Sequence, residues 1–124
     1  MKKYLEILKK LKGKKVGVFV DDANLFYAKK KVGWQVDFGK FRSLLEQTTE
    51  VVFIHYHIAM PAKWDTAYKS SMVYLDKIKK AVDIKTKLLK YIRSNGVLIK
   101  KGDVDLEIAV DVMRNLKNID CVII

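Results

Sequence analysis

Apolar residues group into four short runs that alternate with stretches of helical spacing. The runs cover residues 16–20, 51–59, 97–100 and 120–124, and they are rich in Val, Ile and other large apolar residues. Continuous apolar runs of this length are typical of strands that are covered on both faces. Between them, apolar residues recur every three or four positions, which predicts helices. Strands alternating with helices predict an α/β fold with a mainly parallel sheet and helices on both faces.

Two of the helical stretches have recognisable ends. Asp37 is placed to cap a helix that runs through residues 38–45. Residues 65–94 are expected to be rich in helix, as two helices that meet near Asp83. The sequence Ser94-Asn95-Gly96 then ends the second helix, because Asn and Gly commonly stop helices. The run at residues 97–100 is accordingly predicted to be the third strand of the sheet.

The N-terminal residues follow a pattern of their own. Lysines fill one side of a helical repeat whose other side is apolar, namely Tyr4, Ile7, Leu8 and Leu11. This pattern predicts a basic amphipathic helix within residues 1–14, followed by a domain over residues 15–124. The helix is short and has few apolar anchors, so packing on the domain or on a second copy is favoured over membrane binding. We expect no membrane partner, and a homodimer is one way to cover the apolar side.

The balance of charge points to a polyanionic partner. The 124 residues include 25 Lys and Arg against 14 Asp and Glu, a net charge of +11. Such an excess favours nucleic acid, although a lysine-rich surface also serves solubility. Lysine contacts phosphate without reading base sequence, and the candidate contacts are Lys14, Lys15, Lys100 and Lys101. The single cysteine, Cys121, excludes an internal disulfide framework, so a cytoplasmic location is expected.

Acidic residues follow two of the predicted strands in this basic chain. One group comes after the first strand and the other after the third: Asp21, Asp22 and Asn24, then Asp103, Asp105 and Asp111. Ligands of parallel sheets bind beyond the carboxyl ends of the strands, so these side chains are expected to gather at one edge. Clustered carboxylates repel each other unless a cation neutralises them. Mg²⁺ accepts such oxygen ligands together with water and phosphate.

Each acidic residue also has a purely structural explanation. Asp21 can cap the helix that follows it, and Asp105 can be the N-cap of a later helix. Asp111 shares one helical stripe with Glu107 and Arg114, a pattern typical of a solvated face. From the spacing alone, a metal site and a set of structural roles both remain open.

Other reactive residues lack the setting that their chemistry needs. His55 and His57 share one strand face, but no third ligand is close to them in the sequence, which favours packing. Ser70, Ser71 and Cys121 lack the neighbours that activate a nucleophile. Three aromatic residues are candidates for stacking on bases, namely Trp34, Trp64 and Tyr68. Packing in the core is the commoner role of such residues.

Two segments resemble the conserved blocks of the NYN domains, the LabA-like branch of the PIN nuclease superfamily. Residues 18–28, VFVDDANLFYA, resemble the first block, and residues 100–113, KKGDVDLEIAVDVM, resemble the second. The resemblance implies a PIN-like three-layer sandwich with strand order 3-2-1-4 and a ribonuclease that depends on Mg²⁺ or Mn²⁺. By position it implies that Asp21, Asp105 and Asp111 are catalytic and coordinate the metal. Asn24 and Asp22 would support them, although Asp22 stands where the family often has glycine.

The family pattern continues beyond this sequence. A third block, Ser-Gly-Asp followed by another Asp and Phe, comes after a strand like residues 120–124, and it is not present here. We therefore expect the C-terminal part of the domain to be missing, and this form to be weakened or inactive. The full-length form would be a Mg²⁺- or Mn²⁺-dependent endoribonuclease. The alternative is a non-catalytic nucleic-acid-binding or regulatory module on the same fold, and RNA is the favoured partner in both cases.

Overall fold

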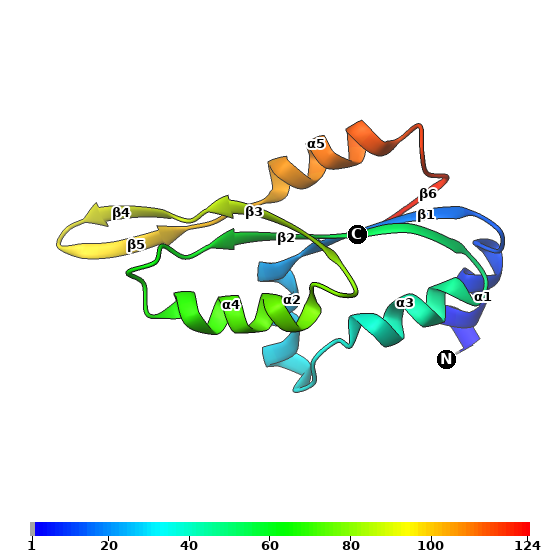
Figure 1. Ribbon diagram of the computed structural model, residues 1–124, viewed down its shortest axis with the longest axis horizontal. Helices are drawn as coiled ribbons and strands as arrows, with labels where there is room; N and C mark the ends of the chain where they lie inside the picture. The colour runs from blue at the N-terminus through cyan, green and yellow to red at the C-terminus, as the bar shows by residue number, and fades with distance from the viewer. Residues whose placement is uncertain (1) are drawn as a thin grey trace.

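A computed structural model describes residues 2–124 and shows a four-stranded parallel sheet between two layers of helices (Figure 1). The spatial order of the strands is β3-β2-β1-β6, and each neighbouring pair is parallel. These strands are β1 (Lys15–Asp21), β2 (Glu50–Met60), β3 (Asp83–Leu88) and β6 (Cys121–Ile123). The predicted three-layer α/β fold is confirmed, and so is the order 3-2-1-4 when the four strands are counted along the chain.

The larger core lies on one face of the sheet, beneath three helices (Figure 1). These helices are α2 (Asp22–Val32), α3 (Phe38–Glu46) and α4 (Ala67–Ile78). They pack on alternate residues of the two central strands, such as Val16, Val18, Ile54 and Tyr56. Asp37 caps α3 as predicted, because its Oδ1 accepts a hydrogen bond of 3.1 Å from the Lys40 amide. This face therefore provides most of the buried apolar surface.

A single helix of the described chain, α5 (Asp105–Asn115), covers the opposite face of the sheet (Figure 1). Ile108 of α5 and Val104, the N-cap residue that precedes the helix, pack with Phe19 and Phe53 of the central strands. Gly17 makes this close approach possible. A Cβ atom at position 17 would lie only 2.8 Å from Phe53 Cζ and 2.9 Å from Ile119 Cδ1.

The predicted third strand is not part of the parallel sheet. Residues 97–101 form β5 (Val97–Lys101), which pairs antiparallel with β4 (Lys90–Ser94) in a hairpin that extends beyond the sheet (Figure 1). Asn95 and Gly96 close the hairpin with φ angles of 52° and 75°, as a two-residue turn with two positive φ values requires. The prediction of a helix stop at Ser94-Asn95-Gly96 is wrong, because the Asn-Gly pair forms the turn of a hairpin.

The true third strand, β3, lies within the stretch that was predicted to be helical. Of residues 65–94, α4 is the one α-helix in the structure, and residues 83–88 and 90–94 are strands. Residues 83–88 alternate Asp and Lys with Ile, Thr and Leu, and most of these residues are exposed. A strand at the edge of a sheet needs few apolar side chains, so it gives a weak hydrophobic signal.

The N-terminal helix α1 (Lys2–Lys10) packs against the domain through one side. Leu8 contacts the larger core, whereas Tyr4 is 70% exposed and Ile7 is 48% exposed. The helix therefore leaves apolar surface uncovered. Among the helices of residues 2–124, none has the length and apolar character needed to span a membrane.

Candidate functional site

Asp21 lies at the carboxyl end of β1, where the chain turns directly into α2. Its Oδ1 accepts hydrogen bonds from the amides of Ala23 and Asn24, at 2.9 and 3.4 Å. Asp21 is therefore the N-cap of α2, and its backbone is still extended. This cap fixes the position of the carboxylate at the sheet edge. The Asn24 side chain is exposed and contributes its backbone amide to the cap.

A second acidic segment reaches the same edge at the start of α5. Asp103 Oδ1 accepts a 2.8 Å hydrogen bond from the amide of Asp105, which is the first residue of the helix. Asp105 is therefore not the N-cap, since Val104 occupies that position. The negative charge of Asp103 raises the pKa of Asp105, and desolvation and the nearby Asp21 act in the same direction. The structure thus brings Asp21, Asp103 and Asp105 of the expected acidic group together at this edge.

Asp111 lies farther along α5 and binds two histidines of β2. Its Oδ2 is 2.7 Å from His55 Nδ1 and 2.7 Å from His57 Nε2. Its Oδ1 accepts a 2.9 Å hydrogen bond from Asn115 Nδ2. Burial would raise the pKa of Asp111, but the hydrogen bonds from His57 and His55 outweigh burial and lower the pKa. The side chain is only 15% exposed, so Asp111 is not on a solvated face.

The two histidines are the residues that sequence reasoning missed. His55 and His57 are buried, and with Asp111 they offer three ligand atoms within 4.8 Å of one another. Two imidazole nitrogens and one carboxylate oxygen are a donor set that suits transition metals. The sequence signal for a site is the i, i+2 spacing of His55 and His57, which places both on one strand face. The third ligand, Asp111, lies more than fifty residues away and could not be recognised from that spacing.

The histidine group and the acidic group are neighbours on one face of the sheet. His57 of β2 is paired with Asp21 of β1, and paired residues of adjacent strands lie about 4.8 Å apart. His57 also contacts Asp111, which links Asp111 to the edge where Asp21 stands. The chain thus places carboxylates from β1 and α5 beside an imidazole pair from β2.

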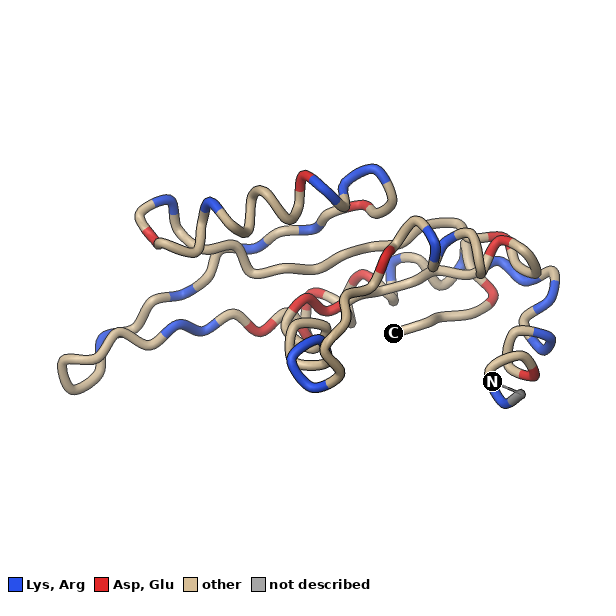
Figure 2. The backbone as a smooth tube through the Cα atoms, turned by 90° about the horizontal axis from the view of Figure 1, so that it is seen from below, with Lys and Arg blue, Asp and Glu red and all other residues tan. Residues whose placement is uncertain are grey.

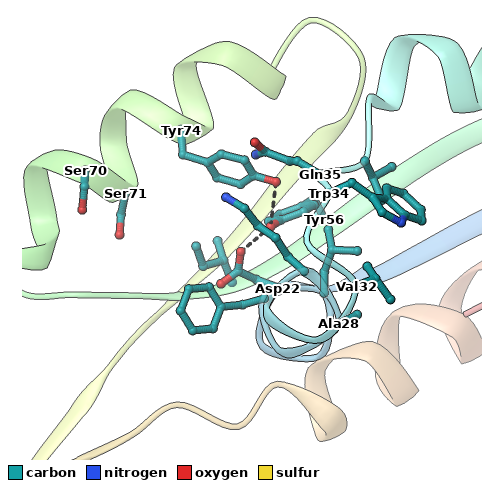
Figure 3. A pocket seen from close by; sticks show the side chains of 14 residues that line it. Asp22, Ala28, Val32, Trp34, Gln35, Tyr56, Ser70, Ser71 and Tyr74 are labelled. Carbon is teal, nitrogen blue, oxygen red and sulfur yellow. Dashed lines mark hydrogen bonds between the residues drawn. The ribbon is translucent and has the colours of Figure 1, made fainter.

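Asp22 points away from this group, toward the face that α2 and α4 cover. It accepts a short hydrogen bond from the Tyr56 hydroxyl, which lies 3.4 Å from the hydroxyl of Tyr74 (Figure 3). Burial raises the pKa of Asp22, the Tyr56 hydrogen bond lowers it, and the charge of Asp21 raises it again. Asp21 and Asp22 are adjacent in the chain, but the Asp21 carboxylate lies in the acidic group and the Asp22 carboxylate lies on the opposite face of the sheet.

The four candidate lysines lie at two separate places. Lys14 and Lys15 are at the amino end of β1, whereas Asp21 is at its carboxyl end. Lys100 and Lys101 belong to the hairpin strand β5, which lies beyond the carboxyl ends of β2 and β3 (Figure 1). Basic residues recur both along the hairpin and near the N-terminus (Figure 2). Lys100 is also engaged in a 2.8 Å ion pair with Asp65.

Comparisons with known proteins identify the family. The family model described as NYN domain matches residues 15–124. A crystal structure of a protein of unknown function from Vibrio parahaemolyticus is similar, with a TM-score of 0.58 and 22% sequence identity. That similarity covers 89% of this chain and 64% of the other chain, and it supports the fold alone. None of the curated proteins matches the sequence. Because the family model covers nearly the whole sequence, the chain belongs to the NYN domain family, a PIN-like nuclease family.

Proposed function

We propose that this domain is a metal-dependent, phosphodiester-hydrolysing domain of the ribonuclease type. The observation that carries the proposal is the convergence of Asp21, Asp103 and Asp105 at one edge of the sheet in a chain of net charge +11. A basic surface attracts a polyanion, and an acidic group at the strand ends holds a cation beside it. Both signs of charge then serve one reaction.

The acidic group fits Mg²⁺ or Mn²⁺. Its donors are carboxylate oxygens, which both ions prefer. Asp103 and Asp21 raise the pKa of Asp105 by repulsion, a cost that a bound cation relieves. Asp21 and Asp105 would hold the ion, and we propose Asp111 as the third ligand. When bound, the ion supplies a water of lowered pKa and a positive charge that offsets charge developing on the phosphate.

The remaining residues position these carboxylates. The amides of Ala23 and Asn24 fix the rotamer of Asp21, and the Asp105 amide fixes that of Asp103. His55 and His57 hold Asp111 ionised, because hydrogen bonds from both imidazoles lower its pKa. Such outer partners orient ligating carboxylates in metal sites. Preorganisation of this kind is what phosphodiester cleavage requires, since the reaction depends mainly on positioning and charge.

One observation favours a non-catalytic nucleic-acid-binding module instead. Both oxygens of Asp111 already have partners, Oδ2 with the two imidazoles and Oδ1 with Asn115. A fully bonded carboxylate is a stable structural unit and has less freedom to bind a metal ion. In that case the acidic group would be reduced to Asp21, Asp103 and Asp105.

The two functions differ in cleavage and in metal dependence. Labelled single-stranded RNA is incubated in three separate reactions. The first contains the protein and Mn²⁺, the second adds excess EDTA, and the third contains the Asp21→Asn variant and Mn²⁺. The nuclease predicts cleavage in Mn²⁺ and its loss in both controls. The exposed Asp83→Asn, at the start of β3, is the matched variant and should leave cleavage unchanged. Binding without cleavage under all these conditions would support the module.

Four finer assignments complete the proposal. We assign the domain to the LabA-like branch on the resemblance of residues 18–28 and 100–113. RNA is the proposed polyanion, and the cytoplasm is the proposed location on the basis of the single cysteine. The uncovered Tyr4 and Ile7 of α1 support a homodimer that buries them. Light scattering at micromolar protein tests this last assignment.

A further inference from the structure

A cavity of about 510 Å³ lies between α2, β2 and α4, on the face of the sheet opposite α5 (Figure 3). Its volume is within the range of pockets that hold small organic ligands, about 300–1,000 Å³. Its wall is mostly apolar and includes Leu25, Val32, Val36 and Ile58. Asp21, Asp103, Asp105 and Asp111 do not line it. Asp22, which the resemblance places in support of the metal, does line it, but its side chain bonds Tyr56 on this face, so the cavity is a separate site.

One carboxylate stands in this apolar wall. Asp22 Oδ1 accepts the hydrogen bond from the Tyr56 hydroxyl, and Oδ2 accepts none from residues 2–124. A carboxylate has about four acceptor positions, so most of those of Asp22 remain for a ligand. Figure 3 shows Asp22 among the labelled side chains, facing Tyr56 and Tyr74. The cavity therefore favours a ligand that presents N–H donors to an apolar pocket.

Aromatic side chains and lysines complete the surroundings. Phe26 is 52% exposed and Trp34 is 62% exposed, and both line the cavity. Exposed aromatic rings at a pocket stack well on flat heterocycles. Lys29 also lines the cavity, and Lys30 Nζ lies 4.7 Å from the centre of the Phe26 ring. A flat ring with N–H donors would thus lie beside positive charge that suits a phosphate.

We infer that this cavity binds the guanine base of a nucleotide. Guanine presents two adjacent donors, N1–H and the N2 amino group, which one carboxylate accepts as a pair. Adenine, cytosine and uracil each place an acceptor beside their donor on the same edge, and that acceptor would face the Asp22 carboxylate. Because Asp22 directly follows Asp21, the base would lie next to the proposed cleavage site. The choice of RNA as the source of this nucleotide rests on the proposed function.

The four ribonucleoside monophosphates test the base preference directly. Each is titrated into the whole chain, and binding is followed through the indole and backbone signals of Trp34 and Asp22 in ¹H–¹⁵N spectra. We expect GMP to bind at least tenfold more tightly than AMP, CMP or UMP. Equal affinity for all four, or no saturation by GMP at millimolar concentration, would overturn the inference.

Two variants separate a lost contact from a lost fold. Asp22→Asn should remove the preference for GMP, because an amide offers one acceptor and one donor instead of two acceptors. Ala28→Leu fills the cavity from α2 without touching the polar groups, and it should abolish binding while the rest of the spectrum is kept. Asp76→Asn, on the exposed part of α4, is the matched control and should bind GMP normally. Unchanged GMP binding in both cavity variants would place the nucleotide elsewhere.

The source of the nucleotide is tested independently of cleavage. In an Asp21→Asn background, which the proposed function predicts to be inactive, GMP binding should be unchanged. In the same background, an oligouridine with one internal guanosine should bind at least fivefold more tightly than oligouridine alone. If GMP binds but the guanosine gives no advantage, the ligand is a free nucleotide and the RNA assignment is wrong. Failure of the nuclease assay alone leaves the GMP result intact.

Discussion

Asp111 has three side-chain partners, and this determines what its carboxylate contributes. His55 and His57 are 9% and 5% exposed, so their ring nitrogens have little access to water. A buried polar group without a partner costs free energy, and the shared oxygen of Asp111 removes that cost for both rings. The lowered pKa of Asp111 means that this stabilisation is present above the unfolded pKa, about 3.9, and is lost as pH falls through the folded pKa.

The first prediction concerns this carboxylate. Asp111→Asn should lower the free energy of unfolding by about 1–3 kcal/mol at pH 7, because hydrogen bonds to a charged acceptor become hydrogen bonds to an amide. Urea unfolding followed by circular dichroism measures the change. The matched variant is Asp83→Asn on the exposed start of β3, which should change stability by less than about 0.5 kcal/mol. If the two variants are equally stable, the histidine–aspartate group does not support the fold.

At the scale of the elements, the sequence predicts the central strands well and the hairpin poorly. β1 and β2 are buried on both faces and read as apolar runs, so their positions were clear. β3 is mostly exposed and rich in Lys, Thr and Asp, so its sequence lacks the apolar pattern of a strand, and the segment is predicted to be helical. The site follows the same division. Asp21 follows the central strand β1, so its place at the sheet edge could be predicted, whereas Asp105 follows the hairpin strand β5 and reaches the same edge by a different route from the one expected. The contact of His57 with Asp111 depends on the tilt and position of α5.

The second prediction concerns the packing of β1 under its neighbours. Gly17→Ala should lower stability by about 1–3 kcal/mol, because the new methyl group would overlap Phe53 and Ile119. Gly39→Ala, in α3, is the matched substitution, since its Cβ meets only Asp37 Oδ1 at 3.3 Å. There the change should be stabilising by up to about 1 kcal/mol, because alanine favours helix. Urea unfolding of both variants would contradict this account if Gly17→Ala were neutral.

The third prediction concerns the base of the hairpin. Asp65 Oδ2 accepts hydrogen bonds of 2.8 Å from the Tyr91 hydroxyl and from Lys100 Nζ, and its Oδ1 accepts one from the Ala67 amide. The Lys100 contact, followed by the Ala67 and Tyr91 hydrogen bonds, lowers the pKa of Asp65 to about 2. A lowered pKa means that the contact is complete above the unfolded pKa of about 3.9 and is lost as pH falls through about 2.

Trp64 reports this loss, because its ring centre is 4.4 Å from that of Tyr91. In a Trp34→Phe background, Trp64 fluorescence should change with a midpoint near pH 2. Far-ultraviolet circular dichroism recorded on the same samples separates the local change from global acid unfolding. Asp65→Asn should remove the transition. A transition of the same midpoint in that variant would show that another group is responsible.

At the scale of the whole molecule, the positive charge is divided between two ends. Lys15 and Asp21 are the two ends of β1, and six residue steps of a strand span roughly 20 Å. The hairpin lysines are instead at the carboxyl side of the sheet, where the acidic group lies (Figure 1). A nucleic acid that places a phosphate at Asp21 can therefore reach the hairpin more directly than it can reach Lys14.

The last prediction uses this separation to locate the nucleic acid. Lys90 and Lys101 are paired across the hairpin, and the double variant Lys90→Gln/Lys101→Gln lowers the net charge from +11 to +9. Lys12→Gln/Lys14→Gln makes the same charge change at the opposite end of the molecule. For single strands, each neutralised phosphate contributes about 0.7 to the slope of log K against log salt.

Fluorescence anisotropy of labelled single-stranded RNA, in EDTA and at several KCl concentrations, gives the slope for each protein. We expect the hairpin variant to lose about 1.4 from the slope, since two phosphate contacts are removed. The Lys12/Lys14 variant should keep the original slope, although its net charge is equally reduced. A lower slope for the Lys12/Lys14 variant and an unchanged slope for the hairpin variant would contradict this account. The RNA would then bind at the amino end of β1, more than one strand length from Asp21, and away from the acidic group.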